Sequence, residues 1–201
     1  QLLVARQDLY LSGFGDCVSL AEYHVPIEGD GENSVFTITA INDETVRMRN
    51  LRIGGGGDDG TGGGIDQRGR VNLSLDAVTI AGNRSALGGG IHVQNALGAN
   101  SGIVYLLPGT VIEQNTALIN GGGIFADGGR VRMHSSDTVI RDNVAASGGG
   151  GVALANVELS VARYVVAAVN GTATGALIQG NRAGSGGGVL VADGNSYLYA
   201  N

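Results

Sequence analysis

Residues 78–91 read Val-Thr-Ile-Ala-Gly-Asn-Arg-Ser-Ala-Leu-Gly-Gly-Gly-Ile, and this stretch decides the fold. It contains an Ile-x-x-Asn marker and, after it, a Gly-Gly-Gly run that precedes a β-branched residue. The Gly run recurs five times along the chain, before Ile65, Ile91, Ile124, Val152 and Val189. Four of these runs follow an Ile-x-x-Asn, and the Gly runs are separated by steps of 26 to 37 residues. Two markers that recur in the same order at such steps indicate a repeat architecture.

Between the markers the apolar residues recur with a period of two, which is typical of strands. Val71, Leu73 and Leu75 alternate in this way, and in the next copy so do Ile103, Tyr105 and Leu107; we expect each set to share one face of a strand. Asp76 and the pair Pro108-Gly109 interrupt the alternation, so each repeat is predicted to hold about three short strands separated by tight corners.

A repeat of this kind buries its apolar side only by stacking on its neighbours. We therefore predict an all-β, right-handed parallel β-helix (a β-solenoid) of roughly six to eight coils, with a spacing of about 4.8 Å between coils. Equivalent residues of successive coils should form ladders. The expected Ile ladder is Ile53, Ile80, Ile112, Ile140 and Ile178, and the expected Asn ladder is Asn83, Asn115, Asn143 and Asn181.

The composition excludes several other classes. Gly accounts for 37 of 201 residues and Pro for 2, which rules out collagen, and 43% of residues are hydrophobic, which suffices for a core. The sequence contains no run of 18 apolar residues, the length that a membrane-spanning helix needs. Cys17 is the single cysteine, which excludes a disulfide framework. The net charge of −6 argues against a nucleic-acid partner, because phosphate binding needs a basic patch.

The paired markers resemble those of the polymorphic outer-membrane proteins, whose repeats are written F-x-x-N and G-G-A-I. They also resemble a wider group of secreted bacterial proteins with pectin-lyase-like β-helices. In that group a leading segment precedes the glycine-rich repeats, as residues 33–38 (Asn-Ser-Val-Phe-Thr-Ile) and 46–53 (Val-Arg-Met-Arg-Asn-Leu-Arg-Ile) do here. The resemblance covers residues 34–192 and implies a right-handed β-helix, located outside the cell or on the outer membrane of a bacterium. It departs from the pattern by placing Ile where that family has Phe.

Residues 1–33 fit the repeat poorly and are expected to form an N-terminal cap or entry segment, followed by β-helical repeats over residues 34–201 in a single domain overall. Within this segment, Leu9, Leu11 and the turn at residues 13–15 are candidates for a first coil. Ser19 to Glu22 has the form of a capping box, which favours a short helix up to about His24. Residues 157–174 exceed their counterparts in length and should protrude as a loop. The sequence begins at Gln1 without a signal sequence, so we expect either a removed signal peptide or an internal fragment.

Few residues suggest a chemical site. Residues 54–59 match one unit of a calcium-binding nonapeptide repeat, which makes Asp58 and Asp59 weak candidate ligands, but such sites need consecutive copies. The three histidines lie on separate segments without metal-like spacing, and Cys17 has no histidine fixed beside it by a motif. The outward charges do not converge on one face by sequence reasoning. The histidines are His24, His92 and His134, and these charges are Arg47, Arg49, Arg132, Asp66 and Glu158.

Three classes of function remain open. The sequence favours a secreted or cell-surface structural protein, such as a rigid adhesin, a spacer or a self-assembling fibre subunit, because the repeats account for the sequence without any catalytic residue or cofactor. Self-association, end to end or side by side, is the expected interaction, and a polysaccharide or a host surface is an alternative partner. A carbohydrate-active enzyme would need grouped carboxylates on one outer face. A carbohydrate-binding β-helix would show exposed aromatic rows, and aromatic residues make up only 4% of this chain.

Overall fold

The computed structural model describes residues 9–12, 25–95, 102–133, 137–155, 164–169, 177–192 and 196–200. All regular elements in these ranges are β-strands, and their pairings are parallel, so the predicted all-β solenoid is confirmed. The expected helix after Ser19, and the residues Cys17, His24, His134 and Glu158, lie outside the described residues. Of the loop expected over residues 157–174, only residues 164–169 are described; they form a paired strand of the solenoid, so the expectation of a protruding loop was wrong for them.

The strands form three sheets. A six-stranded sheet contains β2 (Val25–Glu28), β4 (Leu51–Gly54), β7 (Thr79–Ala81), β11 (Val111–Glu113), β15 (Val139–Arg141) and β19 (Leu177–Gln179). A four-stranded sheet contains β5 (Gly57–Thr61), β8 (Arg84–Leu87), β12 (Thr116–Asn120) and β16 (Val144–Ala145). An eleven-stranded sheet contains β1 (Leu9–Ser12), β3 (Phe36–Arg49), β6 (Ile65–Asp76), β9 (Ile91–Gln94), β10 (Ile103–Leu106), β13 (Ile124–Asp127), β14 (Arg130–Met133), β17 (Val152–Ala155), β18 (Tyr164–Val169), β20 (Val189–Val191) and β21 (Ser196–Ala200).

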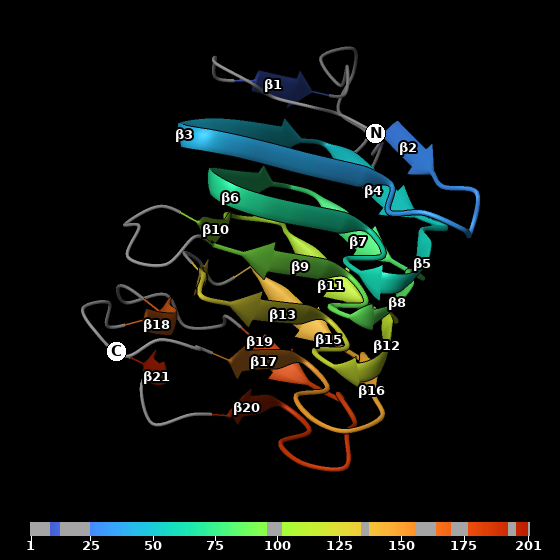
Figure 1. The fold of residues 1–201 in the computed structure, drawn as a ribbon, viewed down its shortest axis with the longest axis vertical. Helices are drawn as coiled ribbons and strands as arrows, with labels where there is room; N and C mark the ends of the chain where they lie inside the picture. Colours follow the sequence, from blue (N-terminus) through green and yellow to red (C-terminus); the bar gives the residue numbers. More distant parts are fainter. Residues whose placement is uncertain are drawn as a thin grey trace.

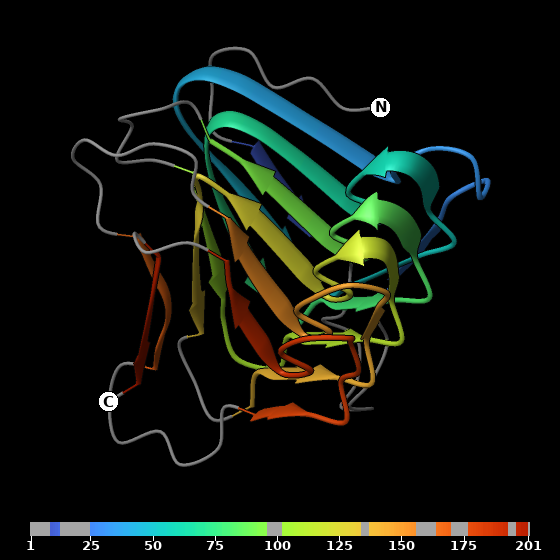
Figure 2. The same ribbon diagram turned by 60° about the horizontal axis from the view of Figure 1, so that its bottom comes forward.

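The eleven-stranded sheet bends into two halves, because the long strands β3 and β6 pass through both. The first half continues through β9, β13, β17 and β20, and the second half through β10, β14, β18 and β21. Each inner coil therefore has four strand segments, for example β7, β8, β9 and β10, and not the three that the sequence suggested. Figures 1 and 2 show equivalent segments of successive coils stacked along the long axis.

About four coils are complete in all three sheets, as the four-stranded sheet shows, and this is fewer than the predicted six to eight. The estimate was wrong because some residues lengthen a coil and do not add one. Eight residues connect β9 to β10, and eight connect β17 to β18. Within the segment expected as a cap, β1 pairs with β3 and β2 pairs with β4, so strands of the first coil already lie before residue 33.

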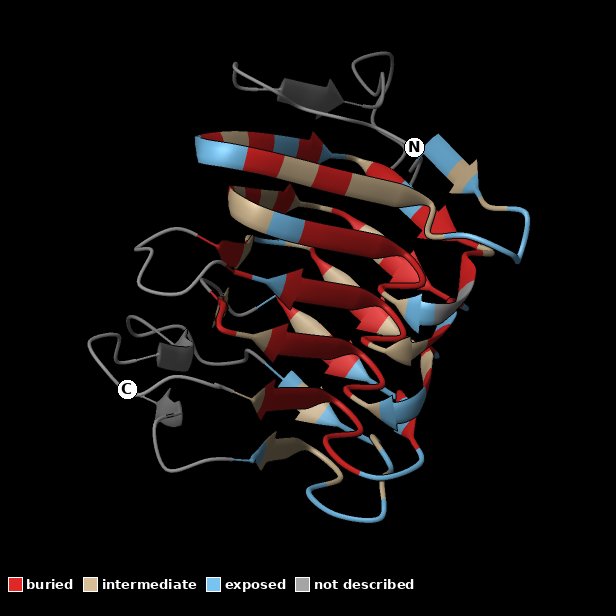
Figure 3. Ribbon diagram, in the orientation of Figure 1, coloured by how far each residue is buried: buried red, intermediate tan, exposed pale blue. Residues whose placement is uncertain are grey.

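The Ile residues of the marker form one column through the core. Ile112 pairs in register with Ile80 above it and Ile140 below it. The column begins at Ile27, which pairs with Ile53, and ends at Ile178. The inner members are fully buried, whereas Ile178 in the last described coil is half-buried. Figure 3 shows this buried interior running along the stack.

One strand has a different register from the one that the sequence suggested. In β10 the buried, inward residues are Val104 and Leu106, which pair with Leu73 and Leu75, while Tyr105 faces outward and is partly exposed. A shift of one residue exchanges the two faces of a strand. Both sets of alternate residues in residues 103–107 are apolar, so the alternation could not decide between them.

At the Gly runs, the backbones of neighbouring coils lie in close contact. A Cβ added to Gly90 would lie 2.6 Å from the carbonyl oxygen of Gly123, and one added to Gly123 would lie 2.6 Å from that of Gly151. The first Gly of the run that contains Gly90 is Gly88, which adopts a φ of +64°. The run is therefore needed both for a left-handed turn and for close contact between coils.

The Asn side chains of the marker connect successive coils, and each of Asn83, Asn115 and Asn143 connects three. The Asn115 side chain donates from Nδ2 to the carbonyl of Ile80 in the preceding coil at 2.9 Å, and to Asn143 Oδ1 in the next coil at 3.0 Å. The backbone N–H of Asn115 donates to the same Asn143 oxygen. Asn83 and Asn143 repeat this pattern, and Asn181 repeats the bond to the preceding coil. The residue before each Asn has a positive φ, so the corner turns through a left-handed residue and leaves the Asn side chain inside.

We expect Asn115→Ala to lower the free energy of unfolding by about 1–3 kcal/mol, because it leaves buried partners of the Asn115 amide without hydrogen bonds. Chemical denaturation monitored by circular dichroism measures the change. Asn42→Ala is the matched control, since Asn42 is exposed and its replacement should stay within about 0.5 kcal/mol. Equal stability of the two variants would contradict a structural role for the Asn ladder.

Candidate functional site

On the first half of the eleven-stranded sheet, the residues that point away from the core form a row, and the turns at the Gly runs cover it. The row runs through Thr37, Asp66, His92, Phe125, Ala153 and Leu190. The first Gly of each run folds back over this row. A Cβ added to Gly62 would lie 2.7 Å from Asp66 Cα, and one added to Gly88 would lie 2.8 Å from the His92 nitrogen. The Gly turns therefore leave Asp66 0% and His92 3% exposed, although both point away from the core.

Asp66 is the centre of a polar cluster. Its Oδ1 lies 2.9 Å from His92 Nδ1, and because an ionised carboxylate only accepts, Nδ1 carries the proton. Its Oδ2 accepts from Thr61 Oγ1 at 3.1 Å and from Arg68 Nε at 2.5 Å. Arg68 Nη2 contacts the same oxygen. These hydrogen bonds satisfy both oxygens of the Asp66 carboxylate. On the far side of His92, Phe125 stacks on the imidazole with the ring centroids 5.6 Å apart.

The cluster keeps Asp66 ionised. Burial by itself raises the pKa of Asp66, but the hydrogen bonds and the electrostatic interactions with His92 and Arg68 outweigh it, so the pKa lies below its ordinary value of 3.8. A carboxylate with a lowered pKa in the folded state contributes stability above its unfolded pKa, and this contribution is lost as the pH falls through the folded value.

We expect the stability advantage of the wild type over Asp66→Asn to be about 1–3 kcal/mol at neutral pH and to shrink as the pH falls from about 5 to about 2. Urea unfolding across this pH range measures it. Glu32→Gln serves as the control, because Glu32 is exposed. A difference between wild type and Asp66→Asn that is constant with pH would show that the charge of Asp66 does not matter to folding.

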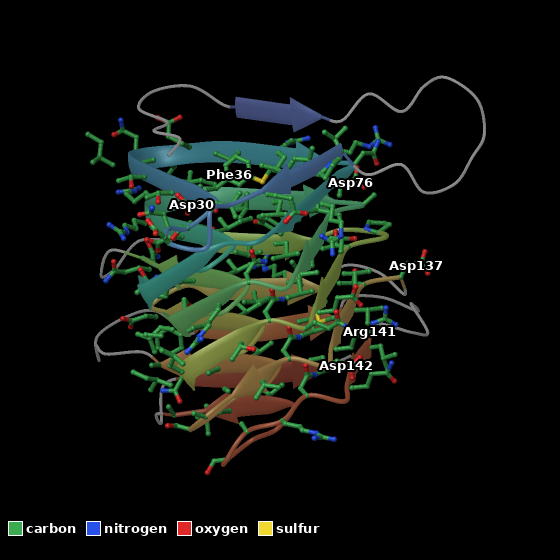
Figure 4. All side chains as sticks on the ribbon, turned by 90° about the vertical axis from the view of Figure 1, so that its right-hand side faces the viewer. Asp30, Phe36, Asp76, Asp137, Arg141 and Asp142 are labelled. Atoms are coloured by element: carbon green, nitrogen blue, oxygen red, sulfur yellow. The ribbon has the colours of Figure 1, made fainter. Side chains whose placement is uncertain are left out.

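A polar groove of roughly 730 Å³ lies beside this cluster at the first coils. Its polar lining comes from Glu28, Asp30, Asn33, Ser34, Thr37 and Arg68. Figure 4 shows Asp30 level with the first coils, above and across from Arg141 and Asp142. The backbone N–H groups of Glu32 and Asn33 donate to Asp30 and hold the pKa of that carboxyl below its ordinary value.

The other residues named from the sequence lie apart from this groove. Arg47 and Arg132 occupy one outward row on the second half of the eleven-stranded sheet, with Ser74 and Tyr105 between them. Arg132 lies over the Tyr105 ring at 5.7 Å, and Arg49 pairs with Asp76 at 3.2 Å. The expectation that the outward charges share no face needs correction, because these arginines share one. Alternation shows which residues of one strand share a face, but it does not show which residues of the neighbouring strands stand in register with them.

Asp58 and Asp59 belong to β5, where Asp58 pairs with Ser85, and their side chains are not among those described. Within the described residues, no group of three His, Cys, Asp or Glu side chains is arranged to hold a metal ion. None of the described residues forms a helix that could cross a lipid bilayer.

Sequence reasoning missed the contact between Asp66 and His92, although a signal was present. Each directly follows the β-branched residue after a Gly run, at Ile65 and Ile91, in consecutive repeats. Residues at the same offset in neighbouring coils stack, so the pairing could have been found by aligning the repeats. Comparison with protein-family models, with curated proteins and with solved structures finds no match to this chain.

Proposed function

We propose that this chain is an extracellular structural module, a rigid β-helical spacer, adhesin or fibre subunit of a bacterial surface. The observation that supports this is the continuity of the Ile and Asn ladders through the inner coils. Each coil is fastened to its neighbours by the same buried side chains, so the stack resists bending between repeats. The likeness of its markers to polymorphic outer-membrane repeats, and through it a right-handed coil and a position outside the cell, is part of the proposal.

Self-association belongs to the same proposal. In the described part of the chain, the outer edges of β19 and β20 have no strand paired to them. Val191 is 37% exposed at this end, although it pairs in register with the buried Leu154. Open edges of parallel sheets with apolar residues beside them favour pairing with another chain.

Light scattering after size exclusion and negative-stain microscopy test the proposal together. We expect straight rods whose length increases with protein concentration, and recovery of the natural protein in the extracellular or outer-membrane fraction of its bacterium. Val191→Lys should reduce the assembly by placing a charge at the edge. Recovery of the natural protein in the cytosol, or a monomer at every concentration that degrades a polysaccharide, would overturn a structural role.

A further inference from the structure

The polar cluster around Asp66 departs from the pattern of its own row. In the coils below, the same position carries Phe125, Ala153 and Leu190, so the fold accepts an apolar side chain there. An apolar residue in a covered position adds hydrophobic stabilisation, whereas a buried carboxylate and its polar partner add little because they lose their hydration. Folding therefore does not explain Asp66 and His92, and residues that break a local pattern are often functional.

The cluster reaches the surface through Arg68. Asp66 is fully buried, whereas 49% of the Arg68 side chain is exposed. The Arg68 guanidinium directs its Nε–H and one Nη2–H at Asp66, and its remaining N–H groups have no partner among the described residues. Asp66 is fixed in turn by His92 and Thr61. Arg68 is therefore held in one orientation with several donors free, which is how a binding arginine is preorganised.

Arg68 lines the groove together with side chains of the opposite charge. The Glu28 carboxylate is 3.2 Å from Arg52, which balances its charge. Asp30 has no cation beside it in the described residues, and its bonded backbone N–H groups favour the ionised form. The groove thus offers a fixed set of donors at Arg68 and an acceptor at Asp30, in a volume that suits a small molecule.

We propose that this groove binds a small carboxylate that also carries hydrogen-bond donors. The ligand carboxylate accepts from the free N–H groups of Arg68, whose planar fork matches it, and an amine or hydroxyl of the ligand donates to Asp30. Asp30 repels an anion that lacks such donors, and a ligand without a carboxylate leaves the free N–H groups of Arg68 without an acceptor of opposite charge. Amino acids and hydroxy acids share this chemistry, and Asp66 and His92 are positioning residues that act through Arg68. The site is additional to the structural role proposed above.

Isothermal titration calorimetry on the whole chain tests the proposal with serine, gluconate and acetate as probes. We expect serine or gluconate to bind in the millimolar range and acetate to bind more weakly, and the stronger of the first two identifies the ligand class. Arg68→Gln should weaken binding about tenfold or more. Arg182→Gln is the matched control, since Arg182 is an exposed arginine away from the groove, and it should bind as the wild type does. Absence of binding by both serine and gluconate, or equal binding by Arg68→Gln, would overturn the proposal.

Asp66→Asn separates positioning from folding. The variant is measured at a temperature where circular dichroism shows it folded. We expect it to bind the probe several-fold more weakly than the wild type, because Arg68 loses its fixed orientation. Unchanged binding by the folded variant would assign the cluster to folding and refute the positioning role.

Discussion

Ile112→Asp is expected to lower the free energy of unfolding by roughly 4–5 kcal/mol, enough to unfold much of a marginally stable domain. Ile112 is 0% exposed between Ile80 and Ile140, so the new carboxylate would lie in the core without a partner. The loss combines the missing apolar burial with the cost of desolvating a charge. Denaturant unfolding followed by circular dichroism measures it.

Two controls accompany this variant. Ile41→Asp introduces the same side chain at a position that is 80% exposed, and should change stability by less than about 0.5 kcal/mol. Ile112→Val removes one methylene group and should cost about 0.5–1.5 kcal/mol. If Ile112→Asp unfolds at the wild-type midpoint, the Ile column does not form the core.

Gly90→Ala should be nearly as damaging although it adds a single methyl group, with an expected loss of about 3 kcal/mol or more. The new Cβ would lie 2.6 Å from the carbonyl oxygen of Gly123. The backbones of Gly90 and Gly123 are hydrogen-bonded between coils, so neither residue can move away freely. The two coils would have to separate locally. Thermal unfolding by calorimetry measures the change.

Gly188→Ala provides a matched control for Gly90→Ala. Gly188 is the third Gly of the last run, and a Cβ there meets only Ile178 Cγ2, at 3.7 Å. Both substitutions restrict the unfolded chain equally, so Gly188→Ala should be neutral or stabilising by up to about 1 kcal/mol. Similar losses in both variants would show that contact between coils is not the reason for the Gly run.

The repeat markers carry most of the information about the fold. Ile112 and Asn115 could be placed from the sequence because both depend on local features, a β-branched inward residue and a side chain that fits a corner. The register of β10 could not be predicted from the sequence, because Ile103 and Val104 are equally suited to the core. Only the pairing of Val104 with Leu73 decides which of them faces inward.

The candidate site was harder to predict, since it depends on how coils stack and not on residue spacing along the chain. Arg68 and Asp66 are two residues apart, but their partner His92 is one coil away, and Asp30 is on the coil above. The groove lies where residues 29–35 connect β2 to β3. Aligning the repeats places His92 beside Asp66, but it does not place Asp30, which precedes the first Gly run.

The bend between the two halves of the eleven-stranded sheet has a consequence for protein engineering and for the divergence of such chains. At this bend β6 passes without interruption, β13 and β14 are joined by two residues, and β9 and β10 by eight. The opposite side, from Ile of one marker to the residue after the Gly run, keeps a nearly constant length of 11 or 12 residues. Insertions are therefore tolerated at one edge of every coil and not at the other. Foreign peptides grafted at this bend in successive coils, for example between β9 and β10 and between β13 and β14, would be displayed in a line along a single edge of the rod, while the side that holds the stack together is left intact.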